Sequence, residues 1–279
     1  MDVAGEQRLE QNIEHRSWWR SMCDLPMGFL SALQFLTVMP PLVRRVFTPR
    51  ELGRSVGWFV VVGLLLGAGL AGADKLLGYL FPVGVAAALL LAIWVLATGA
   101  LHVDGFLDTC DGLFGGRSPE ARLRIMRDHR VGAFAVIGGI LLFLVKYSSL
   151  AGLANRGTAL LLAPAIGRWG MTLAVVMFPY ARTEGLGRWM KDNAGWRQLA
   201  LASVTVLATG IFAARWVGLV IVAIAIAATA IGSLFVLRRI PGLTGDVYGA
   251  LCEMLEALAL LSFVAAEKLV GAGLIGTNW

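Results

Sequence analysis

The chain has 279 residues, of which 58% are hydrophobic and 15% are charged, and its mean hydropathy is +0.75. An ordinary soluble domain is about 45–50% apolar and about 25% charged, so the composition excludes that class and predicts an integral membrane protein. The formal charge of +6 does not by itself indicate nucleic acid, and we expect no nucleic-acid partner. Three scattered cysteines provide neither a disulfide framework nor a zinc site.

Several stretches reach or approach the roughly 20 apolar residues that cross a bilayer. The predicted spans are 56–73, 81–101, 131–153, 158–180, 198–213, 216–237 and 248–270. We therefore predict an all-α, polytopic bundle embedded in the lipid bilayer. Segment 27–39 is short for a crossing and ends in two prolines, so it is either a re-entrant or interfacial helix or an eighth span. Residues 1–26 are expected to form a polar N-terminal extension without a signal-peptide pattern, and residues 27–279 to form one transmembrane domain.

Basic residues alternate between the loops. The connections 41–55, 102–130, 181–197 and 238–247 together hold 15 Lys and Arg residues, whereas the alternate connections hold Lys75, Arg156 and Arg215. By the positive-inside rule the first set faces the cytoplasm, which predicts an inner-membrane protein with its polar loops on the cytoplasmic side. Topology alone would explain the arginines of these loops, but it would not explain the acids among them.

The segment 101–116 carries an acidic constellation. Asp108 and Asp111 follow Asp104 by four and seven residues, and at about 100° per residue all three carboxylates share one helical face. Three like charges repel one another unless a cation lies among them, and such oxygen ligands suit Mg²⁺ or, alternatively, Mn²⁺. Gly105 and Gly112 would let a polyanion approach the backbone. The alternative is a solvated acidic helix end without a ligand.

A second, short helix is predicted to follow, because Ser118 can cap it and Pro119 suits its first position. Its mixture of apolar and basic residues is typical of a helix at the lipid headgroups, and it returns Asp128 and Arg130 towards the acids. His102 and His129 flank this region. Each is a hydrogen-bonding neighbour of the site, an incidental residue at the membrane interface or a metal ligand.

Ionisable side chains inside a span are costly and indicate function by default, usually with a partner. Away from the span ends, the later spans contain two cations and two carboxylates of this kind, namely Lys146, Arg168, Glu253 and Glu256. They are interpreted either as part of a substrate site or as ion pairs that lock the helices together. Just before Glu253, the glycine-rich stretch "PGLTGDVYGA" places Thr244 and Asp246 where backbone N–H groups could approach a phosphate.

The blocks "LHVDGFLDTCDGLFGG", "IMRDHRVG", "ARTEGLG" and "LTGDVYGALCEMLE" resemble, in order and spacing, the cobalamin 5'-phosphate synthase family, whose members are also called adenosylcobinamide-GDP ribazoletransferases. The resemblance covers the chain from about residue 27 onward. It implies a polytopic, Mg²⁺-dependent membrane enzyme in which α-ribazole or its 5'-phosphate displaces GMP from adenosylcobinamide-GDP. The chain departs from the family pattern at His129, where serine is usual, and in "FVVVG" at 59–63, which lacks a proline.

The resemblance and the chemistry together assign roles to the residues. Asp104, Asp108 and Asp111 are expected to bind Mg²⁺, and Asp128 either contacts the metal or acts as the general base. The remaining residues expected to contact substrate are His102, Arg130, Lys146, Arg168, Arg182, Arg188, Thr244, Asp246 and Glu253.

Two other functions remain open from the sequence. A CDP-alcohol phosphotransferase also spaces aspartates along a membrane helix end, and a cation-coupled transporter would use the acids to bind an ion. The lower base, the preference for the 5'-phosphate, the identity of the general base and homo-oligomerisation are not decided by the sequence.

Overall fold

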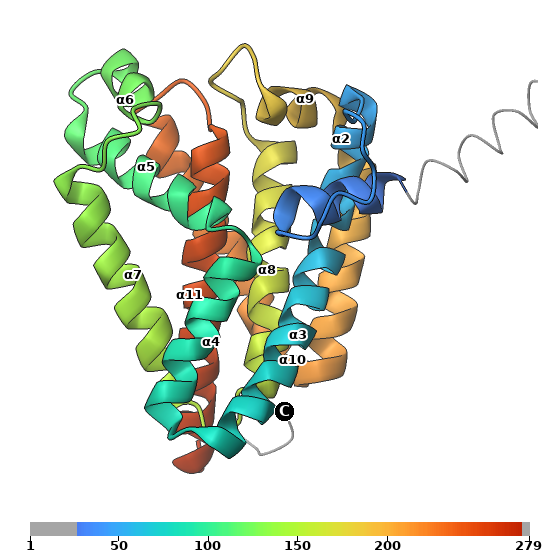
Figure 1. The fold of residues 1–279 in the computed structure, drawn as a ribbon, viewed down its shortest axis with the longest axis vertical. Helices are drawn as coiled ribbons and strands as arrows, with labels where there is room; N and C mark the ends of the chain where they lie inside the picture. The colour runs from blue at the N-terminus through green and yellow to red at the C-terminus, as the bar shows by residue number, and fades with distance from the viewer. Residues whose placement is uncertain (1–26, 275–279) are drawn as a thin grey trace, which may run out of the picture.

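The structure, a computed structural model, describes residues 27–274. It is a bundle of long helices capped at one end by shorter ones (Figure 1). After a short helix over Met27–Leu36, the elements are α2 (Pro49–Ser55), η1 (Val56–Trp58), α3 (Phe59–Leu80), α4 (Val83–Ala97), α5 (Leu101–Gly115), α6 (Pro119–Ile125), α7 (Ala133–Gly152), α8 (Gly157–Met177), α9 (Leu186–Asn193), α10 (Trp196–Leu237) and α11 (Gly245–Gly271). The described residues form no strand beyond an isolated bridge between Tyr180 and Leu243, which confirms the all-α class.

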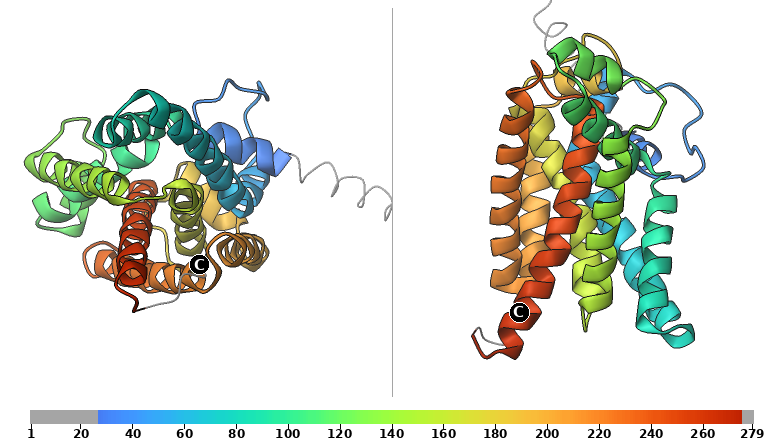
Figure 2. Two further views of the ribbon diagram at one scale, coloured as in Figure 1. Left: turned by 90° about the horizontal axis from the view of Figure 1, so that it is seen from below. Right: turned by 90° about the vertical axis from the view of Figure 1, so that its left-hand side faces the viewer.

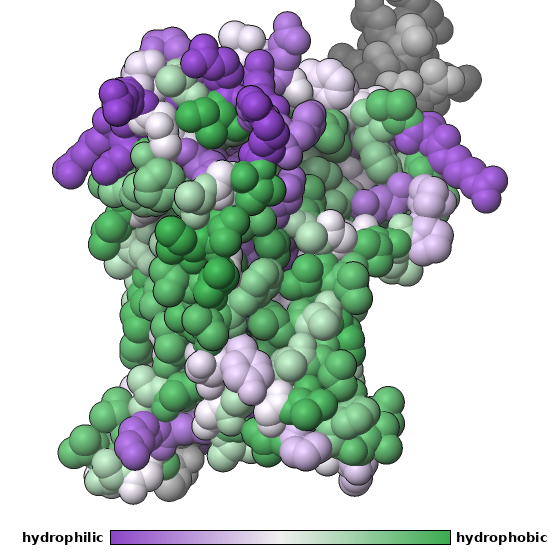
Figure 3. All heavy atoms as spheres, turned by 60° about the vertical axis from the view of Figure 1, so that its left-hand side comes forward, coloured by the Kyte–Doolittle hydropathy of each residue, from purple (hydrophilic) through white to green (hydrophobic). Residues whose placement is uncertain are grey.

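The outside of the bundle is apolar around its middle. Five helical stretches within residues 27–274 are long and apolar enough to cross a membrane, or six if the bent pair α4 and α5 forms one span. Figure 3 shows the matching surface, a hydrophobic belt with hydrophilic residues gathered towards both ends. A continuous apolar belt of this kind is stable in contact with the lipid tails of a bilayer, so this is a membrane protein.

Helix α8 forms the centre of the bundle, and 78% of its apolar stretch is buried inside the protein. Viewed from below in Figure 2, the other long helices surround it. Helix α3 approaches it closely through small residues, because a Cβ on Gly63 would lie 2.7 Å from the carbonyl oxygen of Pro164. Small residues at a crossing let two membrane helices bring their backbones together.

The predicted span 81–101 is broken near its end. Helix α4 stops at Ala97, and α5 begins at Leu101 after a bend of 90°. Gly99 and Ala100 make this bend with φ angles of +60° and +58°, a left-handed conformation that is unfavourable for alanine. Helix α5 therefore leaves the direction of α4 and runs across the end of the bundle (Figure 1).

Helix α10 reverses direction in its middle, where Arg215 has φ 47° and ψ −128°. Both halves lie on α8: the indole Nε1 of Trp169 donates to Ser203 Oγ at 3.0 Å, and a Cβ on the adjacent Gly170 would lie 3.2 Å from Thr229 Oγ1. Ser203 and Thr229 are 26 positions apart in α10, yet they lie at adjacent residues of α8. The two halves of α10 therefore run side by side. The reversal falls where the sequence predicts the connection between two apolar spans.

The segment Met27–Leu36 is a helix of about 15 Å, half the thickness of the hydrocarbon layer. Its Phe29 meets Trp58 edge to face, and its Phe35 stacks on Phe59 at 6.2 Å. It lies across the long helices at the end that also carries α2 and α9 (Figure 1). The polar extension predicted over 1–26 lies outside the described residues.

Candidate active site

Segments distant in sequence meet at one end of the bundle. Helix α5, the loop 126–132, the loop 178–185 and the start of α11 gather there beneath α6 and α9 (Figure 1). Helix α6 begins as predicted, with Pro119 in its first turn and the Ser118 hydroxyl accepting the Ala121 N–H at 3.2 Å. Local capping thus sets the turn that leads the chain back towards the acids.

Helices α5 and α11 cross in backbone contact. A Cβ on Gly105 would lie 2.8 Å from the Asp246 carbonyl oxygen, and a Cβ on Gly249 would lie 3.1 Å from the His102 carbonyl oxygen. Two glycines, one from each helix, therefore allow an approach that larger residues would prevent. The partner that approaches Gly105 is another helix, and the space beside Gly112 is filled by Met126. On the side where a Cβ would stand, both glycines therefore serve packing within the protein, and the approach of a polyanion to them stays a prediction.

The crossing brings carboxylates of the two helices together. The charges of Asp104 and Asp246 both act on Asp108, so the electrostatic partners of Asp108 come from α5 and from α11. Arg182 donates to Asp246 Oδ2 at 2.6 Å and neutralises part of this charge. Thr244 is the N-cap of α11, where its hydroxyl accepts the Val247 N–H at 3.3 Å and donates to Asp246 at 3.2 Å. Arg182 and Thr244 together hold the Asp246 carboxylate in place.

Asp111 has a different set of partners. Its two carboxylate oxygens accept the backbone N–H groups of Gly132 at 2.6 Å and Ala135 at 2.8 Å, so it caps the first turn of α7. The side chain is 8% exposed. It shares the helical face predicted from its spacing and lines the same pocket as Asp104 and Asp108, while its hydrogen bonds anchor α7.

Asp128 lies in the exposed loop between α6 and α7. It accepts three hydrogen bonds from the Arg130 guanidinium, at 3.0 and 3.2 Å from Nε and 2.7 Å from Nη2. These bonds hold the pKa of Asp128 at about 2, well below its ordinary value. His129 lines the pocket beside them. The loop thus returns to the acids as predicted, with Asp128 and Arg130 paired to one another.

Two pockets flank this crossing, and Asp104 lines both. The aromatic pocket, of about 280 Å³, is lined among others by Phe35, Phe59, His102, Tyr180, Arg182, Asp246 and Tyr248. The charged pocket, of about 230 Å³, is lined among others by Asp108, Asp111, Arg127, Asp128, His129 and Arg130. Two separate ligands could therefore reach this one carboxylate.

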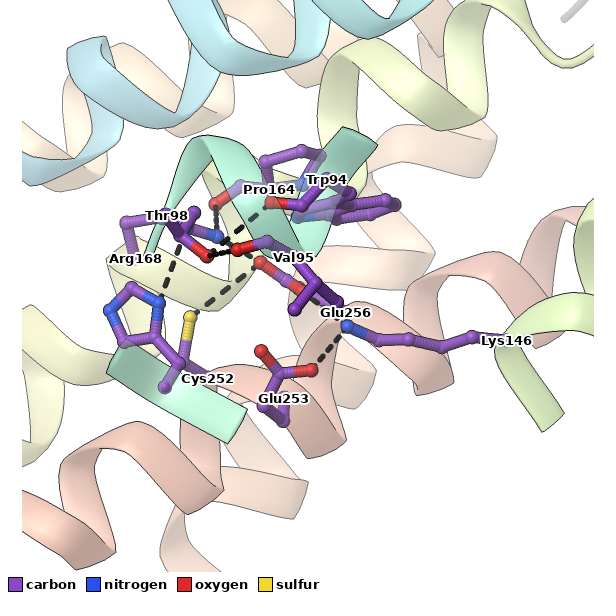
Figure 4. Close-up of polar contacts among 10 residues, drawn as sticks. Trp94, Val95, Thr98, Lys146, Pro164, Arg168, Cys252, Glu253 and Glu256 are labelled. Carbon is purple, nitrogen blue, oxygen red and sulfur yellow. Dashed lines mark hydrogen bonds and ion pairs between the residues drawn. The ribbon is translucent and has the colours of Figure 1, made fainter. Parts of the chain in front are cut away.

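A cluster of buried charges lies further along α11, beyond the residues that cross α5 (Figure 4). Lys146 of α7 pairs with both Glu253 and Glu256 of α11, and Arg168 of α8 pairs with Glu256. These four side chains are at most 5% exposed, and none of them lines either pocket. The structure therefore brings Lys146, Arg168 and Glu253 to one another and not to the pockets, and the ion pairs join α7, α8 and α11.

His102 connects this cluster with the aromatic pocket. Arg168 Nη2 lies 3.3 Å from its Nδ1, and because an arginine can only donate, Nδ1 accepts and the proton of the neutral imidazole is on Nε2. His102 is 1% exposed and lines the pocket, and its Nε2 has no hydrogen-bond partner within residues 27–274.

Arg188 is a predicted site residue that lines neither pocket. It bonds to Asp192 one turn along α9 at 2.8 Å and is partly exposed to solvent. Arg127, Tyr180 and Tyr248 line the two pockets but were not predicted from the sequence. Tyr180 directly precedes the block "ARTEGLG", and Tyr248 lies within the block "LTGDVYGALCEMLE". Their position at these blocks was the signal in the sequence that could have identified them as site residues.

The donor chemistry of the crossing fits a divalent cation. Hard carboxylate oxygens from two helices face one another with incomplete neutralisation by Arg182. Within residues 27–274 no three Asp, Glu, His or Cys side chains already converge as a metal cage. Mg²⁺ does not need such a cage, because proteins commonly hold it with one or two carboxylates, waters and substrate phosphates. Asp104 and Asp108 are the donors best placed for this arrangement, with Asp246 beside them.

Comparison with known proteins finds relatives that cover most of the chain. A relative from Desulforamulus reducens is 38% identical over 242 residues, 85% of this chain and 96% of the relative. One from Stutzerimonas stutzeri is 40% identical over 238 residues, 84% and 96% of the two chains. One from Roseiflexus sp. is 36% identical over 255 residues, 91% and 94% of the two chains. All three are named adenosylcobinamide-GDP ribazoletransferase.

No solved structure matches the chain. The family model for cobalamin-5-phosphate synthase matches residues 28–264, which contain the α5–α11 crossing, both pockets and the buried charge cluster. These matches favour the resemblance seen in the sequence blocks over the CDP-alcohol phosphotransferase and transporter alternatives. The chain is an enzyme and belongs to the cobalamin-5-phosphate synthase family.

Proposed function

We propose that this enzyme transfers adenosylcobinamide phosphate from adenosylcobinamide-GDP to α-ribazole or α-ribazole-5'-phosphate, releases GMP and requires Mg²⁺. The names of its relatives support the joining step of the cobalamin nucleotide loop. The observation that carries the proposal is the position of Asp104 between two pockets, beside Asp108 and Asp246. A transfer between two substrates needs one place where both can meet.

A bound Mg²⁺ would neutralise the charge of the substrate phosphates and orient them, and Mn²⁺ could use the same oxygen donors. Asp104 and Asp108 are the proposed ligands. Arg182 holds Asp246 beside them, and Arg127 and Arg130 supply positive charge on the wall of the charged pocket. Catalysis in such transfers comes largely from positioning and charge stabilisation, which these residues are suited to provide.

In the proposed step, a ribose hydroxyl oxygen forms a bond to the phosphorus that carries cobinamide. The bond from that phosphorus to the bridging oxygen of GDP breaks, and GMP leaves with that oxygen. The hydroxyl proton passes to a carboxylate at the shared wall of the two pockets. No electrons are gained or lost overall, so no redox partner is required.

We further propose that the site faces the cytoplasm of the cell that carries the enzyme in its inner membrane. The loops that form it, 102–130 and 181–197, are two of the basic connections, and the positive-inside rule places such loops in the cytoplasm.

The test is an assay of the full chain in detergent or liposomes. It is incubated with adenosylcobinamide-GDP, α-ribazole and Mg²⁺, and in parallel with α-ribazole-5'-phosphate. We expect GMP and a complete cobamide in equal amounts, and none of either after chelation of the metal. Protein that is folded but forms no cobamide from either nucleoside, while a relative does so under the same conditions, would refute the proposal.

A further inference from the structure

The aromatic pocket has the walls of a site for a planar ring. Phe35 and Phe59 stack with centroids 6.2 Å apart, and Tyr180 and Tyr248 stack at 5.9 Å. These four rings come from separate parts of the chain, and all of them line the same space of about 280 Å³. Aromatic side chains bind nucleobases by stacking, because every base presents a π face.

Polar atoms without partners lie at the same pocket. The Tyr248 hydroxyl and His102 Nε2 are buried and have no hydrogen-bond partner within residues 27–274. Their residues are 4% and 1% exposed, and both line the pocket. Because buried polar groups almost always have a hydrogen-bond partner, these atoms point to a ligand that supplies one. Arg168 fixes His102 Nε2 as a donor, and the tyrosine hydroxyl can donate or accept.

We propose that the aromatic pocket binds the ribazole nucleoside, with its base against the rings and its ribose hydroxyls at Tyr248 and His102. This inference rests on the proposed function and assigns one of its two substrates to one of its two pockets. The ribose would then lie towards Asp104, which the pocket shares with its neighbour. That is where a hydroxyl must lie to reach the phosphorus.

The chemistry of the pocket distinguishes this base from guanine. Apart from the four rings, its wall contains Met171, Val175 and Met190, which suit an apolar benzimidazole better than the amide edge of guanine. Its charged lining consists of Arg182 and three carboxylates, Asp104, Glu184 and Asp246. Because Arg182 already donates to Asp246, this pocket has a single guanidinium, held by a carboxylate, to offer a diphosphate, whereas two arginines line the charged pocket.

The charged pocket suits the other substrate. Within the described residues its lining has no phenylalanine, tyrosine or tryptophan, and it has two arginines, Arg127 and Arg130. Guanidinium groups bind phosphates through paired hydrogen bonds. We therefore place the diphosphate of adenosylcobinamide-GDP there, while the nucleoside occupies the aromatic pocket.

Two variants test the assignment by kinetics and by binding. Tyr180→Leu removes a partly exposed ring, and Tyr248→Phe keeps the ring and removes the unpartnered hydroxyl. We expect each to raise the KM for α-ribazole about tenfold and to leave the KM for adenosylcobinamide-GDP unchanged. Equilibrium dialysis with α-ribazole alone should show the same loss of affinity without depending on turnover.

Tyr79→Leu is the matched control, because Tyr79 is 88% exposed near the end of α3 and lines neither pocket. It should match the unchanged protein in both KM values. A rise in the KM for adenosylcobinamide-GDP, or unchanged KM values in both pocket variants, would overturn the inference. Should Tyr180→Leu lose its thermal unfolding transition, Tyr248→Phe decides the matter. α-Ribazole binding that depends on Tyr248 without any cobamide formed would reject the proposed function and leave this site standing.

Discussion

The backbone of Gly105 in α5 rests on the backbone of Asp246 in α11. A Cβ at position 105 would lie 2.8 Å from the Asp246 carbonyl oxygen and 3.0 Å from its Cα. Real side chains do not tolerate the shorter distance, so only glycine permits this crossing. The contact sets how far the carboxylates of α5 stand from the carboxylate of α11.

The first prediction concerns this contact. Gly105→Ala should move the two helices apart and lower kcat about a hundredfold, since a misplacement of about 1 Å has that effect on catalysis. Overpacking should also cost about 1–3 kcal/mol of stability, measured by thermal unfolding in detergent. Gly115→Ala on the same helix is the control, because its nearest neighbour lies at 3.8 Å. Wild-type turnover in Gly105→Ala would disprove the role of the crossing.

The second prediction concerns the metal. Asp108→Asn keeps the size of the side chain and removes its charge, so the Mg²⁺ concentration for half-maximal rate should rise about a hundredfold or more. The rate is measured across a Mg²⁺ titration at saturating substrates. Asp192→Asn on α9, which removes an exposed carboxylate paired with Arg188, should leave the titration unchanged. An unaltered Mg²⁺ requirement in Asp108→Asn would exclude Asp108 as a ligand.

The third prediction separates Asp111 from its neighbours. Its carboxylate accepts hydrogen bonds from two backbone N–H groups at the start of α7, one on each oxygen. The amide of asparagine has a single acceptor oxygen, so it can replace only one of these two hydrogen bonds. Asp111→Asn should therefore destabilise the fold by about 1–3 kcal/mol with little effect on the Mg²⁺ titration. Thermal unfolding and the titration are measured on the same preparation. If the Mg²⁺ requirement instead rose as in Asp108→Asn, Asp111 would be a metal ligand.

The fourth prediction concerns the buried cluster. Lys146, Arg168, Glu253 and Glu256 carry two charges of each sign within the bundle. Glu256→Gln leaves a net positive charge there and should cost about 3–5 kcal/mol. The double change Lys146→Met with Glu253→Gln keeps the cluster neutral and should cost less. Unfolding midpoints in one detergent compare the two, and a larger loss in the double variant would contradict the ion-pair interpretation.

The fifth prediction concerns pH. The pKa of Asp128 is held at about 2 by Arg130, so the carboxylate remains ionised throughout any ordinary assay range. A base with so low a pKa is a weak proton acceptor near neutral pH. Asp128→Asn should therefore leave the shape of the pH–rate profile unchanged, even where the freed Arg130 lowers the rate. Disappearance of the acid limb in this variant would show that Asp128 is the general base.

Local features of the fold could be predicted from the sequence. The apolar stretches give the long helices, and Ser118 with Pro119 gives the start of α6, because spans and caps depend on residues close in the chain. The bend between α4 and α5 could not be predicted, since Gly99 and Ala100 stand within an apolar run. Spacing put Asp104 and Asp108 on one face, as the charged pocket has them.

The partners of the predicted site residues could not be read from the sequence. Asp111 finds its hydrogen bonds 21 and 24 residues later in the chain, and Asp246 reaches Asp108 only because α11 crosses α5. Lys146 and Arg168 were recognised as buried cations, but their pairing with Glu253 and Glu256 depends on how three helices pack. Long-range packing decides these contacts, and helical periodicity carries no information about it.

The place of Asp104 on the wall of both pockets has a kinetic consequence. Under the proposed function, two ligands held at this carboxylate at the same time would pass the phosphoryl group directly from donor to acceptor, without a covalent enzyme intermediate. Initial-rate plots against one substrate at several fixed concentrations of the other should then intersect, whereas a ping-pong enzyme gives parallel lines. The stereochemistry at phosphorus should likewise be that of one in-line displacement, an inversion.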